Sequence, residues 1–139
     1  MPSTRYRAGI IGCGRIAGKL EDDPLREHPC THAGIYSSSS KIELAACCCP
    51  DINRAAEFAD KWKMPAWYVS SEEMFAKEKL DIVSICTPAS FHADMTIQAA
   101  QAGVKAVFCE KPMALSLEEA DRMLECCHKN RVLLTINHL

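Results

Sequence analysis

The sequence predicts an α/β fold, a doubly wound and mostly parallel six-stranded sheet with helices on both faces. Three observations predict it. Short apolar runs alternate with helical patterns, the runs are nearly continuous in apolar character, and the first of them ends in a glycine-rich turn. Continuous apolar runs are typical of parallel strands covered on both faces, and strict strand–helix alternation is typical of right-handed crossovers. We expect the whole chain, residues 1–139, to form one domain.

The expected strands are apolar runs bounded by polar residues or glycine. They cover residues 8–11, 42–49, 67–69, 81–86, 105–109 and 132–136. Helices are expected over 51–62, from Ser70 to Lys77, over 91–102 and from Ser116. Ser70 and Ser116 each stand three residues before a glutamate, the pattern of a capping box. Segment 21–30 is acidic, contains two prolines and is expected to be a surface loop before a helix near Thr31.

Composition excludes several classes of partner. The net charge is −2, with 48% hydrophobic and 24% charged residues, and no basic cluster occurs. Nucleic acid binding therefore has no electrostatic basis in this sequence. No apolar run approaches the roughly 20 residues that span a bilayer, and the first residues do not form a signal peptide, so no membrane association is expected.

Cysteine usage points to a reducing compartment. The chain has nine cysteines, an odd number, and three of them are consecutive. Most lie inside apolar runs, where a free cysteine behaves as a small hydrophobic residue, so we expect a cytoplasmic protein without disulfides. No Cys-x-x-Cys pair occurs, and Cys126-Cys127-His128 lacks a second ligand pair, so we expect no metal site.

The turn after the first strand carries the main functional motif. Gly12-Cys13-Gly14-Arg15-Ile16-Ala17, called the glycine turn below, has the G-x-G-x-x-A form of a dinucleotide-binding fingerprint and opens a helical pattern. Gly12 allows the tight turn, Gly14 lets the backbone approach a pyrophosphate, and Ala17 allows close helix–strand packing. Backbone N–H groups at this corner suit phosphate oxygens. The sequence therefore predicts a Rossmann fold in which Gly12, Cys13, Gly14, Arg15 and Ile16 contact a nicotinamide dinucleotide.

The end of the second strand leaves the choice between NAD and NADP open. A carboxylate at this position usually bonds the ribose 2′-hydroxyl of NAD. Alignment of strand ends puts Cys49 at the acid position, and Asp51 follows two residues later, where it can cap the next helix. Without a carboxylate a 2′-phosphate is not repelled, and Arg54 or Arg15 could receive it. Cys49 is expected to line the cofactor site with either nucleotide.

Three motifs together resemble the Gfo/Idh/MocA oxidoreductases, and the likeness extends over the whole chain. The motifs are the glycine turn, Cys86-Thr87-Pro88 with His92, and Cys109-Glu110-Lys111-Pro112. The resemblance implies an N-terminal NAD(P)-binding Rossmann domain, a C-terminal substrate domain and a homo-oligomeric full-length enzyme. It also implies sugars, cyclitols or related hydroxy compounds as substrates. The chain ends near the expected sixth strand, so we expect the family's second domain to be absent from these 139 residues.

The resemblance also assigns roles after the fourth and fifth strands. It places Lys111 beside the nicotinamide and the reacting carbon, as the catalytic residue, with Glu110 toward the cofactor. Strand ends of open α/β sheets are where ligands bind, which independently favours this position. Thr87 and Pro88 are expected to line the cofactor. His92 either contacts the cofactor or supports the loop. The family often has asparagine where this chain has Ala89.

The sequence supports three hypotheses of function. The first is an NAD(P)-dependent dehydrogenase or reductase in its full-length form, whose 139-residue part binds cofactor but shows little turnover because a substrate pocket needs further walls. The second is a stand-alone nucleotide-binding or redox-sensing module without catalysis. The third is a degenerate domain that binds nothing, which the intact glycine turn and the Glu110-Lys111-Pro112 motif argue against.

Overall fold

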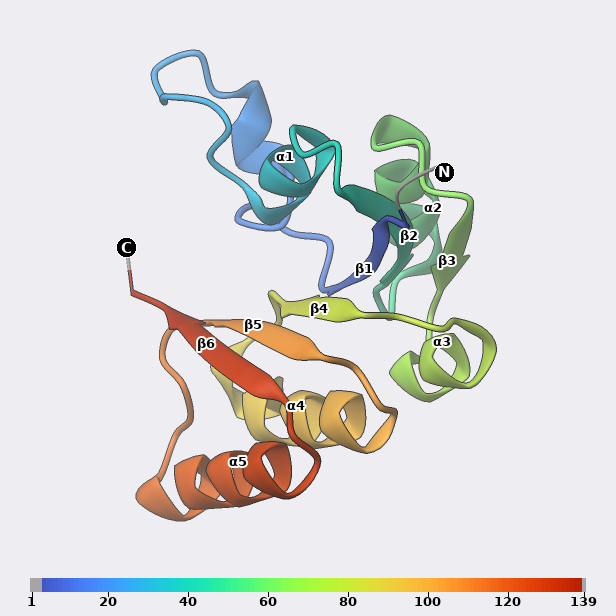
Figure 1. Cartoon of the computed structure of the whole chain (residues 1–139). Coiled ribbons are helices and arrows are strands. Elements are labelled where there is room, and N and C mark those ends of the chain that lie inside the picture. The colour runs from blue at the N-terminus through green and yellow to red at the C-terminus, as the bar shows by residue number, and fades with distance from the viewer. Residues whose placement is uncertain (1–3, 139) are drawn as a thin grey trace.

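The computed structural model describes residues 4–138 and confirms the expected fold class. Six parallel strands form one sheet in the order β3-β2-β1-β4-β5-β6 (Figure 1). Their bounds are β1 Tyr6–Ile11, β2 Ile42–Cys48, β3 Ala66–Tyr68, β4 Ile82–Ile85, β5 Ala106–Glu110 and β6 Leu133–Asn137. This is the strand order of the doubly wound dinucleotide-binding fold.

Helices cover both faces of the sheet. The helices α1 (His32–Ser37) and α2 (Ile52–Lys61) pack on one face, and α3 (Ser71–Lys77), α4 (His92–Gln101) and α5 (Leu117–Lys129) pack on the other. In Figure 1, α4 and α5 lie side by side beneath β4, β5 and β6. The sheet is therefore buried on both sides, which explains why its strands are apolar at nearly every position.

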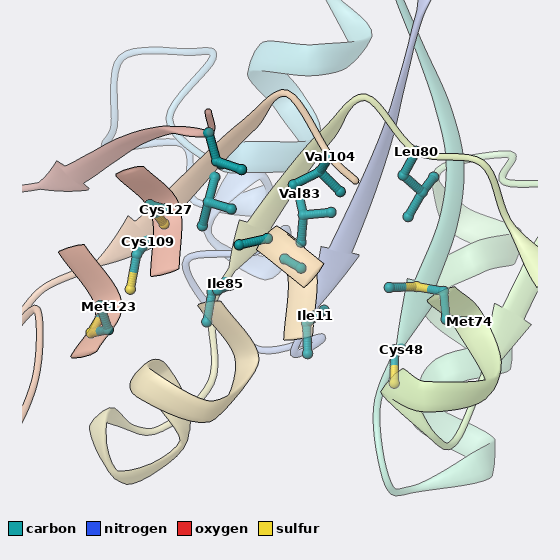
Figure 2. Close-up of a cluster of buried hydrophobic side chains, with 14 of the residues drawn as sticks. Ile11, Cys48, Met74, Leu80, Val83, Ile85, Val104, Cys109, Met123 and Cys127 are labelled. Atoms are coloured by element: carbon teal, nitrogen blue, oxygen red, sulfur yellow. The ribbon is translucent and has the colours of Figure 1, made fainter. Parts of the chain in front are cut away.

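Each face has its own hydrophobic core. Figure 2 shows the core under α3, α4 and α5, where Ile11, Val83 and Ile85 from the central strands lie between Met74 of α3 and Met123 of α5. The core under α1 and α2 combines small residues such as Ala8, Ala33 and Cys47 with the larger Ile10, Tyr36, Phe58 and Met64. Cysteines contribute to both cores, and all nine are free thiols.

Side-chain caps fix the starts of four helices. Asp51 Oδ1 accepts hydrogen bonds from the backbone N–H groups of Asn53 and Arg54, and so begins α2. Ser70 and Ser116 accept from the N–H three residues ahead, as the sequence predicts, and Thr31 does the same for α1. Each cap satisfies an N–H group that the first turn of a helix leaves without an intrahelical partner.

The expected helix after the glycine turn does not form. Residues 14–18 make one loose helical turn, the short 3₁₀ helix η1 (Lys19–Asp22) follows, and α1 begins only at His32. Pro24 and Pro29 in the intervening loop cannot donate backbone hydrogen bonds. The Glu21 carboxylate instead accepts the N–H groups of Cys30 and Thr31, which holds the loop against the start of α1.

A second 3₁₀ helix, η2 (Ala89–Phe91), leads into α4. Gly103, whose backbone is left-handed with φ of 90°, follows the end of α4. Among residues 4–138, no helix combines the length and apolar character that a membrane crossing requires.

Candidate functional site

The candidate site lies where the strand order reverses. From β1 the chain crosses to β2 on one side, whereas β4 lies on the other, so the carboxyl ends of β1 and β4 flank a crevice. Gly12 follows β1 with φ of 93°, and a Cβ there would lie 2.6 Å from the carbonyl oxygen of Cys86, directly after β4. Glycine is therefore required at position 12 for both backbone conformation and strand packing.

The glycine turn presents a row of free backbone donors. Gly12 N–H donates to the Cys48 carbonyl at 2.8 Å. Within residues 4–138, the next five N–H groups, from Cys13 to Ala17, donate to no protein acceptor. A Cβ on Gly14 would meet nothing within 4 Å, so this residue faces open space. Buried or partly buried N–H groups without partners are rare, and a run of them beside open space suits the oxygens of a diphosphate.

Two cavities meet at this turn. The first cavity, about 540 Å³, extends from the glycine turn toward the ends of β2 and β3, and the second, about 980 Å³, extends toward the ends of β5 and β6. Cys86 and Thr87 line both. An elongated dinucleotide fits this layout, with its phosphates at the turn and one nucleoside in each cavity.

The structure brings ten of the eleven sequence-predicted site residues to these two cavities. Gly12, Cys13, Gly14, Cys49, Thr87 and Pro88 line the first, and Arg15, Ile16, Thr87, Glu110 and Lys111 line the second. Lys111 is exposed and lies directly after β5, while Glu110, the last residue of that strand, is 9% exposed.

His92 is not among the residues that line the two cavities. Its side chain is buried, with Nδ1 2.7 Å from the Pro112 carbonyl oxygen and Nε2 2.9 Å from that of Thr87. The imidazole thus ties the loop after β4 to the loop that carries Lys111. This geometry favours the supporting role for His92 over direct contact with a cofactor.

A buried polar chain at the base of the second cavity was missed by sequence reasoning. His32 Nε2 lies 2.6 Å from Glu110 Oε1, and His32 Nδ1 lies 2.7 Å from Ser84 Oγ. Tyr36 Oη lies 2.6 Å from the same Ser84 oxygen, and Asn137 Nδ2 donates to Glu110 Oε1 at 2.8 Å. No local motif could reveal the chain, because His32 and Glu110 are 78 residues apart.

The cysteines around the cavities behave as packing residues. The thiol of Cys13 has its pKa raised, first by a hydrogen bond with Cys47 and then by burial. Burial also raises the pKa of Cys48 and of Cys109 to about 12, and raises that of Cys86 well above its ordinary value. Since the thiolate is the reactive form, these groups are poor nucleophiles at neutral pH.

One group of potential metal-ligand types occurs in the loop before α1. The ligand atoms of Glu21, His28 and Cys30 lie within 4.8 Å of one another. The Glu21 carboxylate, however, accepts hydrogen bonds from Cys30 N–H, Thr31 N–H and the Thr31 hydroxyl. We therefore assign Glu21 a structural role at the start of α1.

Comparison with known proteins gives consistent results. The GFO_IDH_MocA family model, described as an oxidoreductase family with an NAD-binding Rossmann fold, matches residues 6–138. D-glucoside 3-dehydrogenase of Escherichia coli is 33% identical over 93% of this chain, and myo-inositol 2-dehydrogenase of Thermotoga maritima is 32% identical over 92%. The chain spans about a third of the length of these relatives, 33% and 34%.

Solved structures agree with the sequence relatives. The WlbA dehydrogenase of Chromobacterium violaceum, in complex with NADH and UDP-GlcNAcA, superposes with a TM-score of 0.83 at 25% identity, covering 99% of this chain and 36% of that one. Myo-inositol 2-dehydrogenase of Lactobacillus plantarum gives 0.80 at 29% identity, covering 96% of this chain and 36% of that one. The chain belongs to the GFO_IDH_MocA oxidoreductase family, and residues 6–138 are its NAD-binding Rossmann domain.

Proposed function

We propose that this chain is the cofactor-binding part of an NAD(P)-dependent oxidoreductase that moves hydride to or from a sugar, a cyclitol or a similar hydroxy compound. The observation that carries the proposal is the run of five unpartnered N–H groups between the two cavities, since it supplies diphosphate binding without rearrangement of the turn. The substrate class is supported by the E. coli and T. maritima relatives, which are named as dehydrogenases of a D-glucoside and of myo-inositol.

The glycine turn and the two cavities each bind a different part of the dinucleotide in this proposal. The glycine turn holds the diphosphate, and its open Gly14 leaves room for the oxygens. The first cavity, lined by Cys49, takes the adenosine half, and the second, lined by Thr87 and Lys111, takes the nicotinamide half. A bound nicotinamide supplies the hydride acceptor or donor.

Lys111 is the proton donor and acceptor of the proposed reaction. Oxidation of an alcohol to a carbonyl releases a hydride from carbon and a proton from oxygen, and reduction is the reverse. In the reduction the Lys111 ammonium hydrogen-bonds the carbonyl oxygen and gives it a proton, and in the oxidation the neutral Lys111 amine takes the proton of the hydroxyl group. His92 and Pro112 keep this part of the loop next to Thr87 through the His92 ring. The substrate would contact Lys111 from the second cavity.

Further properties of the whole protein are part of the same proposal. The relatives are about three times as long as this chain, so a second domain like theirs would supply the other walls of a substrate pocket. We propose that the full-length form is a homo-oligomer. We also propose a cytoplasmic location, supported by nine free thiols, eight of which lie in or against the hydrophobic cores.

Titration of the 139-residue chain with NADH and NADPH, followed by calorimetry, tests the proposal. We expect saturable one-to-one binding of at least one nucleotide, and little hydride transfer when the chain is mixed with a panel of sugars and cyclitols. Binding by neither nucleotide would contradict a cofactor domain. Robust turnover by the chain alone would show that no second domain is needed, whereas binding combined with inactive full-length protein would favour the stand-alone binding module.

A further inference from the structure

The rim of the first cavity at the end of β2 has an unusual chemical composition. Cys49, directly after β2, lines the cavity and is 5% exposed. Its N–H donates to the Tyr68 carbonyl at 3.0 Å, which holds it in line with the strand ends. In dinucleotide-binding folds this position faces the adenosine ribose, and a carboxylate there bonds the 2′-hydroxyl and repels a 2′-phosphate. A thiol supplies neither effect.

The nearest acid in the sequence is occupied elsewhere. Asp51 Oδ1 accepts the N–H groups of Asn53 and Arg54 at 3.0 and 3.1 Å, so it serves as the cap of α2. Asp51 does not line the first cavity. Glu72, in the first turn of α3, is the carboxylate among the lining residues, and it follows β3 rather than β2.

The same rim offers a cation. Arg54, in the first turn of α2, is exposed and lines the cavity together with Cys49, Ser70 and Ser71. Within residues 4–138 its guanidinium forms no ion pair and no hydrogen bond with another side chain. The positive charge of Arg54 also acts on Cys13 in the glycine turn. It lowers the pKa of that thiol, whereas the hydrogen bond with Cys47 and burial raise the pKa by more.

We propose that this rim binds the 2′-phosphate of NADP(H). Arg54 pairs with the phosphate, and Cys49 determines specificity because it stands where an NAD-selective domain has a carboxylate. The inference rests on the proposed function and adds which nucleotide the domain selects. An arginine guanidinium is always charged and presents several N–H donors in a geometry that matches phosphate oxygens. Ser70 and Ser71 add hydroxyl groups to this side of the cavity, and Glu72 is the other charged residue among those that line it.

The test compares NADPH with NADH on the 139-residue chain, and 2′,5′-ADP with 5′-AMP as probes of the adenosine end alone. We expect NADPH and 2′,5′-ADP to bind at least about tenfold more tightly than NADH and 5′-AMP. R54Q should weaken NADPH binding by about tenfold to a hundredfold, the effect of one charged hydrogen-bonded pair, and should change NADH binding less than about twofold. R122Q, which removes an exposed arginine on α5 far from the rim, is the matched control and should change neither.

C49D tests the second determinant. It should weaken NADPH and strengthen NADH, and its unfolding temperature is measured alongside because the position is buried. R54Q keeps the inference testable if C49D does not fold. The inference is overturned if NADH binds more tightly than NADPH, if R122Q acts like R54Q, or if E72Q weakens NADH while R54Q changes nothing. Absence of binding by both nucleotides would instead overturn the proposed function.

Discussion

His32 Nε2 lies 2.6 Å from Glu110 Oε1, so the first residue of α1 is joined directly to the last residue of β5. An ionised carboxylate only accepts hydrogen bonds, so Nε2 donates to Glu110, while Nδ1 lies 2.7 Å from the Ser84 hydroxyl. Asn137 holds the same Glu110 oxygen from β6. The backbone that enters Lys111 is therefore fixed from two neighbouring elements.

Removal of the His32 ring should destabilise the fold. H32A leaves the buried Ser84 hydroxyl and the Glu110 carboxylate short of a partner, so we expect a loss of about 2–4 kcal/mol in the free energy of unfolding. Urea unfolding of H32A against the wild type measures it. H128Q changes a histidine in the exposed last turn of α5 and should cost less than about 0.5 kcal/mol. A loss in H32A no larger than that of H128Q would show that the pair contributes nothing.

Gly14 should matter for binding and not for stability. Its φ is outside the left-handed region and a Cβ meets nothing within 4 Å, so G14V should keep the wild-type unfolding temperature. The new side chain occupies the space of the diphosphate, so dinucleotide binding should weaken at least about tenfold, measured by calorimetry.

Gly103 is the matched control for Gly14. A Cβ there also meets open space, but its φ is 90°, so G103A should cost about 1 kcal/mol and leave binding unchanged. The expected pattern is thus opposite in the two variants. Unaltered nucleotide binding by folded G14V would rule out the diphosphate at this corner.

His92 should connect stability to cofactor binding. H92A leaves the carbonyl groups of Thr87 and Pro112 without the ring that joins them, so we expect a loss of about 1–3 kcal/mol together with weaker dinucleotide binding. Urea unfolding and nucleotide titration measure the two effects. T96V, which alters a buried hydroxyl of α4 without a hydrogen-bond partner, changes the same helix away from the loops and should leave binding intact. Equal binding by H92A and T96V would assign His92 to the core alone.

Asp81 should contribute to the loss of folding stability at acid pH. Its carboxylate accepts the Arg7 N–H at 2.8 Å, and this hydrogen bond is the first cause that holds its pKa below the ordinary 3.8. Because the pKa is lowered in the folded state, the contribution of Asp81 to the free energy of unfolding is fully present above the ordinary pKa of 3.8. It is lost as the pH falls below 3.8 through the folded-state pKa.

D81N should therefore lower stability at neutral pH by about 1–2 kcal/mol and remove part of the decline in acid. Urea unfolding of both proteins between about pH 7 and pH 3 gives the comparison. D121N, on the exposed face of α5, serves as control. A constant difference between D81N and wild type down to the lowest pH would contradict the assignment.

Much of the site was predictable because it rests on local backbone chemistry. The two glycines of the turn, the residues after β4 and the Glu110-Lys111-Pro112 motif each lie at the end of a strand, and parallel strands bring their carboxyl ends to one edge. Ten predicted residues therefore line the cavities. The role of His92 was left open in sequence because its partners, Thr87 and Pro112, lie in two different loops.

By itself, the sequence determined the alternation of strands and helices, the capped starts of α2, α3 and α5, and the glycine turn, since these depend on residues within a few positions of one another. Only the tertiary structure decided the loose turn in place of a helix after Gly14, the His32–Glu110 pair and the placement of Arg54 beside Cys49. His32 and Glu110 are 78 residues apart, and the turn after Gly14 is bonded to the start of α1 through the N–H groups of His32 and Ala33. Cys49 and Arg54 are close in sequence, but the other walls of their cavity come from segments after β1, β3 and β4, which only the assembled sheet brings together.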